Sequence, residues 1–204
     1  MNTVLLSTTY FGPIQWYQKL YRAERVEIEQ WESFKKQTYR NRCLIATTNG
    51  IQALTVPAEH SDSQLIKDIR LSDHGNWRHL HWNAIQTAYG ESPFFEYYQD
   101  DIRPFYEKRW EFLLDFNEEI RRKMCELIDF EPSISLTQSF SPLQQEENSF
   151  ADFREAINPK HPQEDPDFSP KCYYQVYEKK HGFLPNLSIL DLLMNMGPES
   201  IFYL

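Results

Sequence analysis

The chain has 204 residues, of which 41% are hydrophobic and 25% charged, as is ordinary for a soluble globular protein, and its length suffices for one sizeable domain or two small ones. Its formal net charge of −9 argues against general nucleic-acid binding, which favours a basic surface. No apolar run is as long as a membrane-spanning helix, and the N-terminus lacks the basic residues that begin a signal peptide. The three cysteines lie far apart in the sequence, as is typical of reduced thiols. We therefore expect a cytoplasmic protein.

The N-terminal segment predicts a strand, a helix and a second strand. Residues 3–11 form an apolar run that indicates a buried strand. Pro13 then opens a segment with apolar side chains at helical spacing, and residues 25–32 alternate between apolar and polar side chains. This order is that of one βαβ unit, in which a right-handed crossover makes the two strands parallel.

A β-hairpin is predicted next, over residues 42–59. Two β-rich runs flank Asn49 and Gly50, a pair of residues strongly preferred in tight hairpin turns. Residues 65–72 indicate a further short strand.

The middle of the chain is predicted to be helical. Residues 77–89 form one helix, which Asn76 can cap, and residues 93–109 form another, which Pro104 bends or divides. Residues 112–130 place their apolar side chains on one stripe, the pattern of an amphipathic helix packed on a core.

The rest of the chain changes character twice. A short strand is predicted at 133–139, after which residues 141–170 are polar and rich in proline, as is typical of a long loop. Residues 171–204 are aromatic and apolar, so we expect them to dock on the core. We therefore predict a single α/β domain, with a core at 1–140, a mainly parallel sheet that starts βαβ, an added β-hairpin and a central cluster of helices.

The most concentrated positive charge lies in the segment 34–42, which holds four basic residues and no acidic one: Lys35, Lys36, Arg40 and Arg42. If this segment is extended, Lys36, Arg40 and Arg42 share one face. Three cations on one face suit an anion such as a phosphate or a carboxylate. The alternative is a solvated strand whose cations pair with acidic residues elsewhere in the fold.

The junction between the first strand and the first helix offers a second candidate site. Ligands of α/β proteins bind at the carboxyl ends of strands and at helix N-termini. The alternative is an ordinary strand-to-helix turn. The side chains that supply hydroxyls and an amide at this junction are Thr8, Thr9, Tyr10 and Gln15.

His81, in the predicted helix 77–89 near Tyr89, is a candidate general base, because a histidine titrates near neutral pH. The alternative, that it is a structural histidine, stays open. His79 and His81 point in different directions on a helix and cannot share a metal ion, so we predict no metal site. No glycine-rich phosphate loop and no nucleophile-elbow motif occurs in the sequence.

Several segments resemble the WbqC-like family, in the order in which that family has them. The resemblance covers most of the chain and weakens across 141–169, and the C-terminal segment is most similar to the branch found in Bacteroidetes. The segments are YFGPIQWYQKL at 10–20, the basic segment and hairpin at 34–57, and the stretches 77–95, 113–120 and 182–198.

The resemblance implies a role in the synthesis of bacterial surface polysaccharides such as O-antigen. It also implies transfer of glycine to the amino group of a nucleotide-linked amino sugar. Thr8 and Thr9 depart from the family pattern, in which many members have Gln or His followed by Pro. The candidate site residues that match the family are Tyr10, Lys36, Arg40, Asn41, Arg42, His81 and Tyr89.

Two functions follow, and we favour the first. It is an enzyme that transfers an acyl or aminoacyl group to the amine of a nucleotide-sugar, whose diphosphate the cations would bind. Glycine needs an activated carboxyl group, which ATP can supply, but the sequence identifies no cofactor. The catalytic candidates are His81 and Tyr10, and the ligand-binding candidates are Lys36, Arg40, Asn41, Arg42, Thr8, Thr9, Gln15 and Tyr89.

The second function is that of a non-catalytic protein of the same pathway. Such a protein would bind a nucleotide-sugar or assemble with other enzymes of the pathway. The absence of a recognisable catalytic motif favours it. In both cases the expected partner is an anionic small molecule rather than a nucleic acid.

Overall fold

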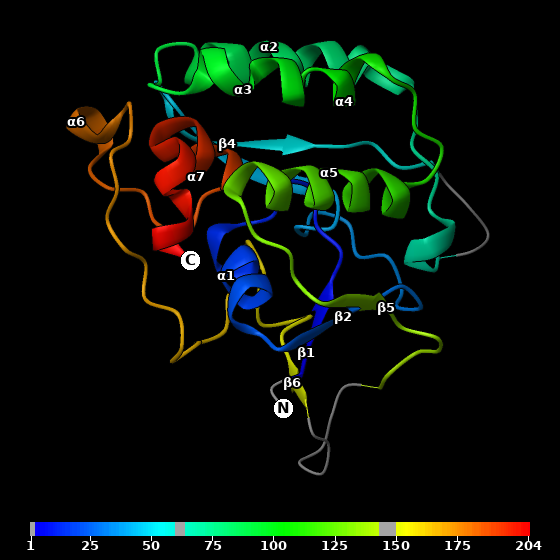
Figure 1. Ribbon diagram of the computed structural model, residues 1–204. Helices are drawn as coiled ribbons and strands as arrows, with labels where there is room; N and C mark the ends of the chain where they lie inside the picture. The colour runs from blue at the N-terminus through cyan, green and yellow to red at the C-terminus, as the bar shows by residue number, and fades with distance from the viewer. Residues whose placement is uncertain (1–2, 60–63, 143–149) are drawn as a thin grey trace.

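The N-terminal part of the protein forms the predicted βαβ unit. Strand β1 (Thr3–Ser7) leads into helix α1 (Ile14–Arg22), which returns the chain to strand β2 (Arg25–Glu29). The two strands are parallel, with Ser7 opposite Glu29, so both end at the same edge of the sheet. The predicted α/β fold class is confirmed. The computed structural model describes three stretches of the chain (Figure 1): residues 3–59, 64–142 and 150–204.

The parallel sheet has four strands, in the order β5-β2-β1-β6. Strand β5 (Ile134–Leu136) pairs with β2 and confirms the strand predicted at 133–139. Strand β6 (Phe150–Asp152) pairs with β1 and corrects the prediction of a continuous loop over 141–170. A strand of three residues is too short to show an alternating pattern, so only its pairing with β1 identifies it.

The predicted β-hairpin is confirmed as a separate two-stranded sheet. Strands β3 (Arg42–Thr47) and β4 (Gly50–Thr55) are antiparallel, and Gly50 has a φ of 100°, which glycine adopts without a Cβ clash. The strand predicted at 65–72 is wrong. A short 3-10 helix, Ile66–Asp68, occupies that segment, and with the other described residues its flanks make isolated bridges rather than a ladder of strand hydrogen bonds.

Four helices follow in the middle of the chain, and the predicted division at Pro104 is confirmed. They are α2 (Trp77–Tyr89), α3 (Phe95–Ile102), α4 (Pro104–Glu107) and α5 (Leu113–Ile128). In the part of the chain that the structure describes, no helix is both long enough and apolar enough to span a lipid bilayer.

The start of α2 differs from the prediction. A 3-10 helix, His74–Asn76, directly precedes it, and Asn76 adopts a left-handed conformation with a φ of 48°. In this conformation the Asn76 side chain makes no capping hydrogen bond to α2. The predicted cap is therefore wrong.

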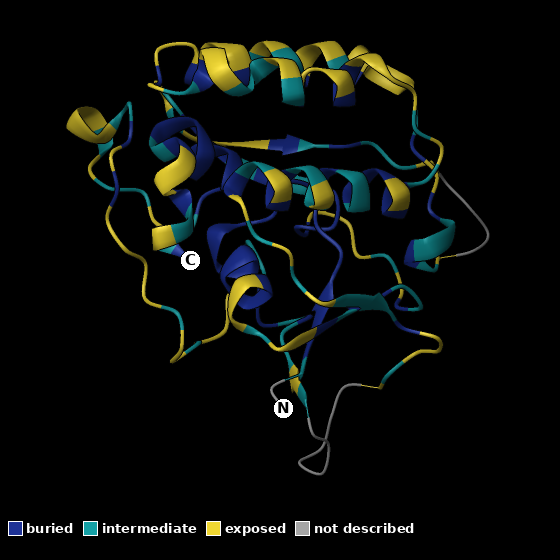
Figure 2. Ribbon diagram, viewed as in Figure 1, coloured by how far each residue is buried: buried dark blue, intermediate teal, exposed yellow. Residues whose placement is uncertain are grey.

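The C-terminal segment contributes helix α6 (Glu178–His181), helix α7 (Ile189–Met196) and a final 3-10 helix, Gly197–Tyr203. The backbone N–H of Ile14 donates to Leu187 O at 3.0 Å, which joins this segment to the start of α1. Figure 2 shows α1 and α7 as largely buried, in agreement with the apolar side chains that both helices place in the core.

The molecule is layered. In Figure 1 the helices α2, α3 and α4 form a layer at the top, with the β-hairpin below them and the parallel sheet toward the bottom. Helices α2 and α7 both contact strand β3 of the hairpin, and α7 also contacts α1. The hairpin therefore links the helical layer to the rest of the core.

Candidate functional site

The carboxyl ends of three neighbouring parallel strands meet at one edge of the sheet. Each of these strands ends in a polar residue, Ser7 on β1, Glu29 on β2 and Asp152 on β6. Strand β2 lies on one side of β1 and β6 on the other, so the strand order reverses next to β1. Open α/β sheets bind ligands in the crevice at such a reversal, outside the carboxyl ends of the strands. This edge is therefore the first candidate for a ligand site.

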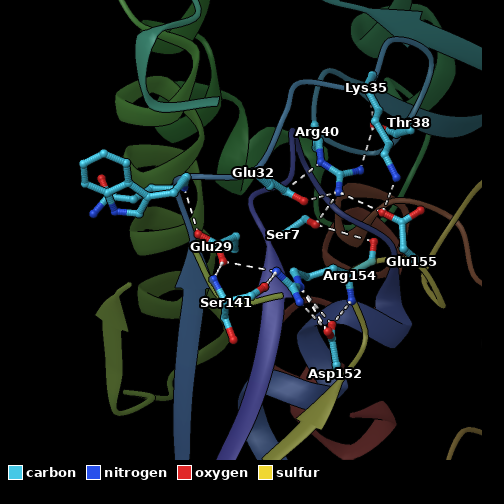
Figure 3. A network of polar contacts seen from close by, with 12 residues as sticks. Ser7, Glu29, Glu32, Lys35, Thr38, Arg40, Ser141, Asp152, Arg154 and Glu155 are labelled. Carbon is cyan, nitrogen blue, oxygen red and sulfur yellow. Dashed lines mark hydrogen bonds and ion pairs between the residues drawn. The ribbon is translucent and has the colours of Figure 1, made fainter. Parts of the chain in front are cut away.

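Arg154, two residues after β6, is buried against this edge (Figure 3). Its Nε and Nη2 donate to Asp152 Oδ1 at 3.0 Å and Oδ2 at 2.5 Å, and its Nη1 donates to Glu29 Oε2 at 3.1 Å. Burial alone would lower the pKa of the Arg154 guanidinium, but the hydrogen bond and charge of Asp152 raise the pKa. Arg154 is thus a permanent cation that joins the ends of β2 and β6.

Arg40 forms a second buried ion pair at the same edge and is only 3% exposed (Figure 3). Its Nε and Nη2 donate to the two carboxylate oxygens of Glu32 at 2.8 and 2.5 Å, and Nη2 also donates to Ser7 Oγ at 2.7 Å. Glu155 Oε1 lies 3.6 Å from this Nη2 and 2.7 Å from Lys35 Nζ. The two-pronged pairing with Glu32 holds the guanidinium in one orientation.

These side chains form one group, which we call the carboxyl-edge network. Buried ion pairs are costly to desolvate and are weak evidence for stability, so a large group of them at a ligand-binding edge suggests a functional role. Its four carboxylates face three cations, and the excess carboxylate favours a positively charged ligand group such as an amine. The members are Ser7, Glu29, Glu32, Lys35, Arg40, Asp152, Arg154 and Glu155.

A cleft of about 350 Å³ opens beside the carboxyl-edge network. Its described lining offers carboxylates, two cations and two aromatic side chains, a set that can bind an amine, a phosphate and a flat ring at once. Its lining is Trp31, Glu32, Ser33, Lys35, Phe140, Arg154 and Glu155.

The basic segment 34–42 is not extended, so the predicted shared face of Lys36, Arg40 and Arg42 is wrong. The chain turns between 36 and 41, and Gln37 has a left-handed φ of 62°. This turn carries Arg40 back onto Glu32 in the interior. Lys36 is left exposed, and Arg42 lies on the hairpin, where its Nε donates to the Thr55 hydroxyl at 2.9 Å.

The residues predicted after the first strand are buried. Thr8 and Thr9 follow β1, and the hydroxyl of neither has a hydrogen-bond partner among the described residues. A Cβ at Gly12 would lie 2.4 Å from the Thr9 hydroxyl oxygen, so the turn needs a glycine there. Gln15 Nε2 donates to Asp165 Oδ2 at 2.8 Å, which ties α1 to the loop that follows β6. The described lining of the carboxyl-edge cleft includes none of them.

The two catalytic candidates, Tyr10 and His81, are in contact although 71 positions separate them. His81 Nδ1 lies 2.9 Å from the Tyr10 hydroxyl oxygen, which lies 2.7 Å from that of Tyr106. Burial lowers the pKa of His81 to about 4, although a hydrogen bond with the Thr55 backbone raises it. His81 is therefore neutral at pH 7, and an N–H directed at the Thr55 carbonyl leaves Nδ1 free to accept from Tyr10.

Asn41 and Tyr89, also predicted as ligand-binding residues, lie in the interior. Asn41 Nδ2 donates to Val56 O at 2.9 Å and so ties the end of the turn to the chain beyond the hairpin. Burial raises the pKa of Tyr89 well above its usual value, and the nearby Asp191 carboxylate on α7 raises it further. Neither residue belongs to the described lining of the carboxyl-edge cleft.

Most of the carboxyl-edge network was not among the residues predicted from the sequence. Glu29 and Glu32 are visible in the sequence as acidic residues near the end of the strand predicted at 25–32. Asp152, Arg154 and Glu155 carried no signal, since β6 is not visible in the sequence pattern. Within the described stretches no group of three or more potential metal ligands occurs.

The comparisons with known proteins agree with the resemblance noted above. A model of the WbqC-like protein family matches residues 8–163, more than half of the chain and all of the carboxyl-edge network except Ser7. The chain is also similar to the uncharacterized protein Rv1507c of Mycobacterium tuberculosis (strain ATCC 25618 / H37Rv). The two are 27% identical over 197 residues, which covers 84% of this chain and 83% of that protein. No solved structure matches this chain.

Proposed function

We propose that this chain, which belongs to the WbqC-like protein family, acts in the synthesis of bacterial surface polysaccharides such as O-antigen. Its substrate in this proposal is a nucleotide-linked amino sugar, to whose amine it transfers a glycyl group. The observation that carries the proposal is the cleft beside the carboxyl-edge network. We place this activity in the cytoplasm, which is consistent with the three free cysteines of the described chain.

The lining of the cleft suits the parts of such a substrate. Glu155 faces both Arg40 and Lys35, and its partly exposed carboxylate can also accept a hydrogen bond from a protonated sugar amine. The half-exposed Lys35 offers a mobile charge to a diphosphate. Trp31 and Phe140 supply flat apolar faces on which a base or a sugar ring can stack.

Glu155 is also the best placed proton acceptor in this site. In the transfer step the sugar ammonium first loses one proton to water, and the neutral amine nitrogen attacks the carbonyl carbon of an activated glycyl donor. An amide bond forms, the donor's leaving group departs with the bonding electrons, and the nitrogen releases its second proton. That second proton passes to Glu155, which exchanges with solvent because its side chain is 31% exposed. Glu32 is less suited, since Arg40 occupies both of its oxygens.

Binding is tested with three probes: UDP-glucosamine, UDP-glucose and UDP. A ligand of the native state raises the melting temperature, and UDP-glucosamine should give the largest shift because it alone carries an amine. Lys35→Gln should weaken the binding of all three probes about tenfold, as expected for the loss of a charged contact with a phosphate. Lys36→Gln is the matched control, because Lys36 is an exposed lysine next to Lys35 in the sequence but lies outside the described lining of the cleft. Equal effects of the two variants would contradict the proposed site.

The transfer itself is tested by mass spectrometry of UDP-glucosamine incubated with the protein, glycine and ATP. A glycyl amide of the sugar is expected, and Glu155→Gln should slow its formation by about 100-fold or more, the usual contribution of a general base. The alternative function, a non-catalytic nucleotide-sugar-binding or assembly protein, is favoured by the extensive internal pairing of the network. Binding of UDP-glucosamine without any glycyl product would establish that alternative instead.

A further inference from the structure

A second cleft lies in the helical layer, between the first half of α2 and helix α4. It has a volume of about 390 Å³ and shares no described lining residue with the carboxyl-edge cleft. In Figure 1 this helical layer is at the top, whereas the parallel sheet is toward the bottom. We call it the arginine cleft, and its lining is Asp73, Asn76, Arg78, His79, Trp82, Arg103, Tyr106, Glu107 and Arg109.

The described lining of this cleft brings together three arginines and two carboxylates. Arg78 and Arg109 both approach Asp73, with N···O distances of 2.5 and 3.5 Å. Arg103 pairs with Glu107 at 2.6 Å. The lining is thus locally positive, although the chain as a whole carries a formal charge of −9.

Arg78 has an unused donor in addition. Its Nη1 donates to Asp73, but its Nε is buried and has no hydrogen-bond partner among the described residues. A buried guanidinium N–H without an acceptor is costly, so the lining of the cleft holds an arginine whose donors are incompletely paired. This unpaired donor, together with the excess of cations, indicates an anionic ligand rather than a solvated charged surface.

The floor of the cleft is aromatic and rigid. The rings of Trp82 and Tyr106 lie 6.0 Å apart with an interplanar angle of 35°. The hydroxyl of Tyr106 bonds that of Tyr10, which in turn bonds His81, so the Tyr106 ring cannot turn without breaking a buried chain of hydrogen bonds. Such fixed apolar faces suit the flat side of a sugar ring.

We propose that the arginine cleft binds a small ligand in which a sugar-sized ring carries a phosphate or carboxylate group. The anionic group would pair with the guanidinium groups of Arg78 and Arg109, while the ring packs on Trp82 and Tyr106. This inference does not depend on the proposed function of the carboxyl-edge cleft, because the described linings of the two clefts have no residue in common.

The test is an NMR titration of the ¹⁵N-labelled full chain with glucose 1-phosphate, glucuronate and glucose. The NMR signals of the Trp82 indole and of the backbone amides of 73–82, 103 and 105–109 should shift with saturation for the two anionic sugars, and glucose should bind about tenfold more weakly. Arg78→Gln should weaken the binding of glucose 1-phosphate about tenfold. Arg109→Gln should weaken it at least about threefold, and because this side chain is 85% exposed the variant will fold even if Arg78→Gln does not.

Arg122→Gln is the matched control, since Arg122 is 65% exposed, pairs with a carboxylate on α5 and lies outside the arginine cleft. It should leave binding unchanged, and so should Lys35→Gln in the other cleft. Shifts of the cleft resonances that survive Arg109→Gln undiminished would overturn the proposal. So would an equal loss in Arg122→Gln, which would indicate attraction to net charge, or the absence of any shift at the cleft.

Discussion

Replacing Arg40 by glutamine is expected to destabilise the protein by about 3–5 kcal/mol, the usual cost of removing one partner of a buried ion pair. Arg40 is 3% exposed, and it is the residue to which both carboxylate oxygens of Glu32 are bonded. Glutamine is too short to make both hydrogen bonds to Glu32 and carries no charge, so the Glu32 carboxylate would stay buried without a cation beside it. The free energy of unfolding from urea denaturation measures the loss.

Two neighbouring cations provide the controls for this variant. Lys36→Gln removes an exposed charge and should change stability by less than about 0.5 kcal/mol. Arg42→Gln removes one partly buried hydrogen bond to Thr55 and should cost about 1 kcal/mol. Adding Glu32→Gln to Arg40→Gln removes the unpaired carboxylate and should recover much of the loss. An Arg40→Gln variant as stable as Lys36→Gln would show that the Arg40–Glu32 pair contributes nothing measurable.

The predicted roles of Arg40 and its neighbours show where sequence patterns stop being informative. The concentration of charge in 34–42 was visible, but its geometry depends on a left-handed residue, Gln37, in a position where the sequence shows no glycine or asparagine. Without that turn the segment is predicted to be extended. With it, Arg40 enters the interior and the three cations separate.

The elements with strong local patterns were predicted correctly. The βαβ unit, the hairpin and the amphipathic helix α5 each have several consecutive residues whose periodicity favours one structure. Strand β6 depends on a pairing between residues almost 150 positions apart, and three residues carry no periodic signal. Asp152 ends that strand, and Arg154 and Glu155 follow it, so three of the eight residues of the carboxyl-edge network were hidden along with it.

The contact between Tyr10 and His81 is a different case. Each was selected from its own sequence context, and neither context indicated the other as a partner. Tyr10 lies between β1 and α1 and His81 lies on α2, and the tertiary fold brings the two together in the interior, where both are buried. The same burial that makes the contact also lowers the pKa of His81 to about 4. Sequence spacing cannot predict such a shift, because it depends on how completely the core excludes water.

Two buried titratable groups should make the free energy of unfolding depend on pH in opposite directions, over nearly the same pH range. Asp191 on α7 accepts from the Tyr173 hydroxyl at 2.7 Å and from Gln175 Nε2 at 3.0 Å. Burial raises its pKa to about 6, although these hydrogen bonds lower it. His81 shifts the other way, to a pKa of about 4, because burial disfavours its charged form. Unfolded Asp and His titrate near about 3.9 and about 6.5.

Between pH 4 and 6 the folded protein holds a proton on Asp191 that the unfolded chain has lost, so stability falls by about 3 kcal/mol as the pH rises. Between pH 4 and 6.5 the unfolded chain holds a proton on His81 that the folded protein lacks, so stability rises by about 3 kcal/mol. The two effects nearly cancel in the parent protein. As the pH rises from 4 to 6, the free energy of unfolding of Asp191→Asn should therefore increase relative to that of the parent, and that of His81→Gln should decrease relative to it.

Urea denaturation of the parent and both variants at half-unit pH steps measures these differences. Ile128→Val, a buried change without a titrating group, is the control, and its difference from the parent should be independent of pH. If the stability difference between Asp191→Asn and the parent did not change with pH, the Asp191 carboxyl group of the parent would titrate alike in the folded and unfolded chains. A flat difference for His81→Gln would mean that His81 is open to solvent, which would return it to consideration as a general base near neutral pH.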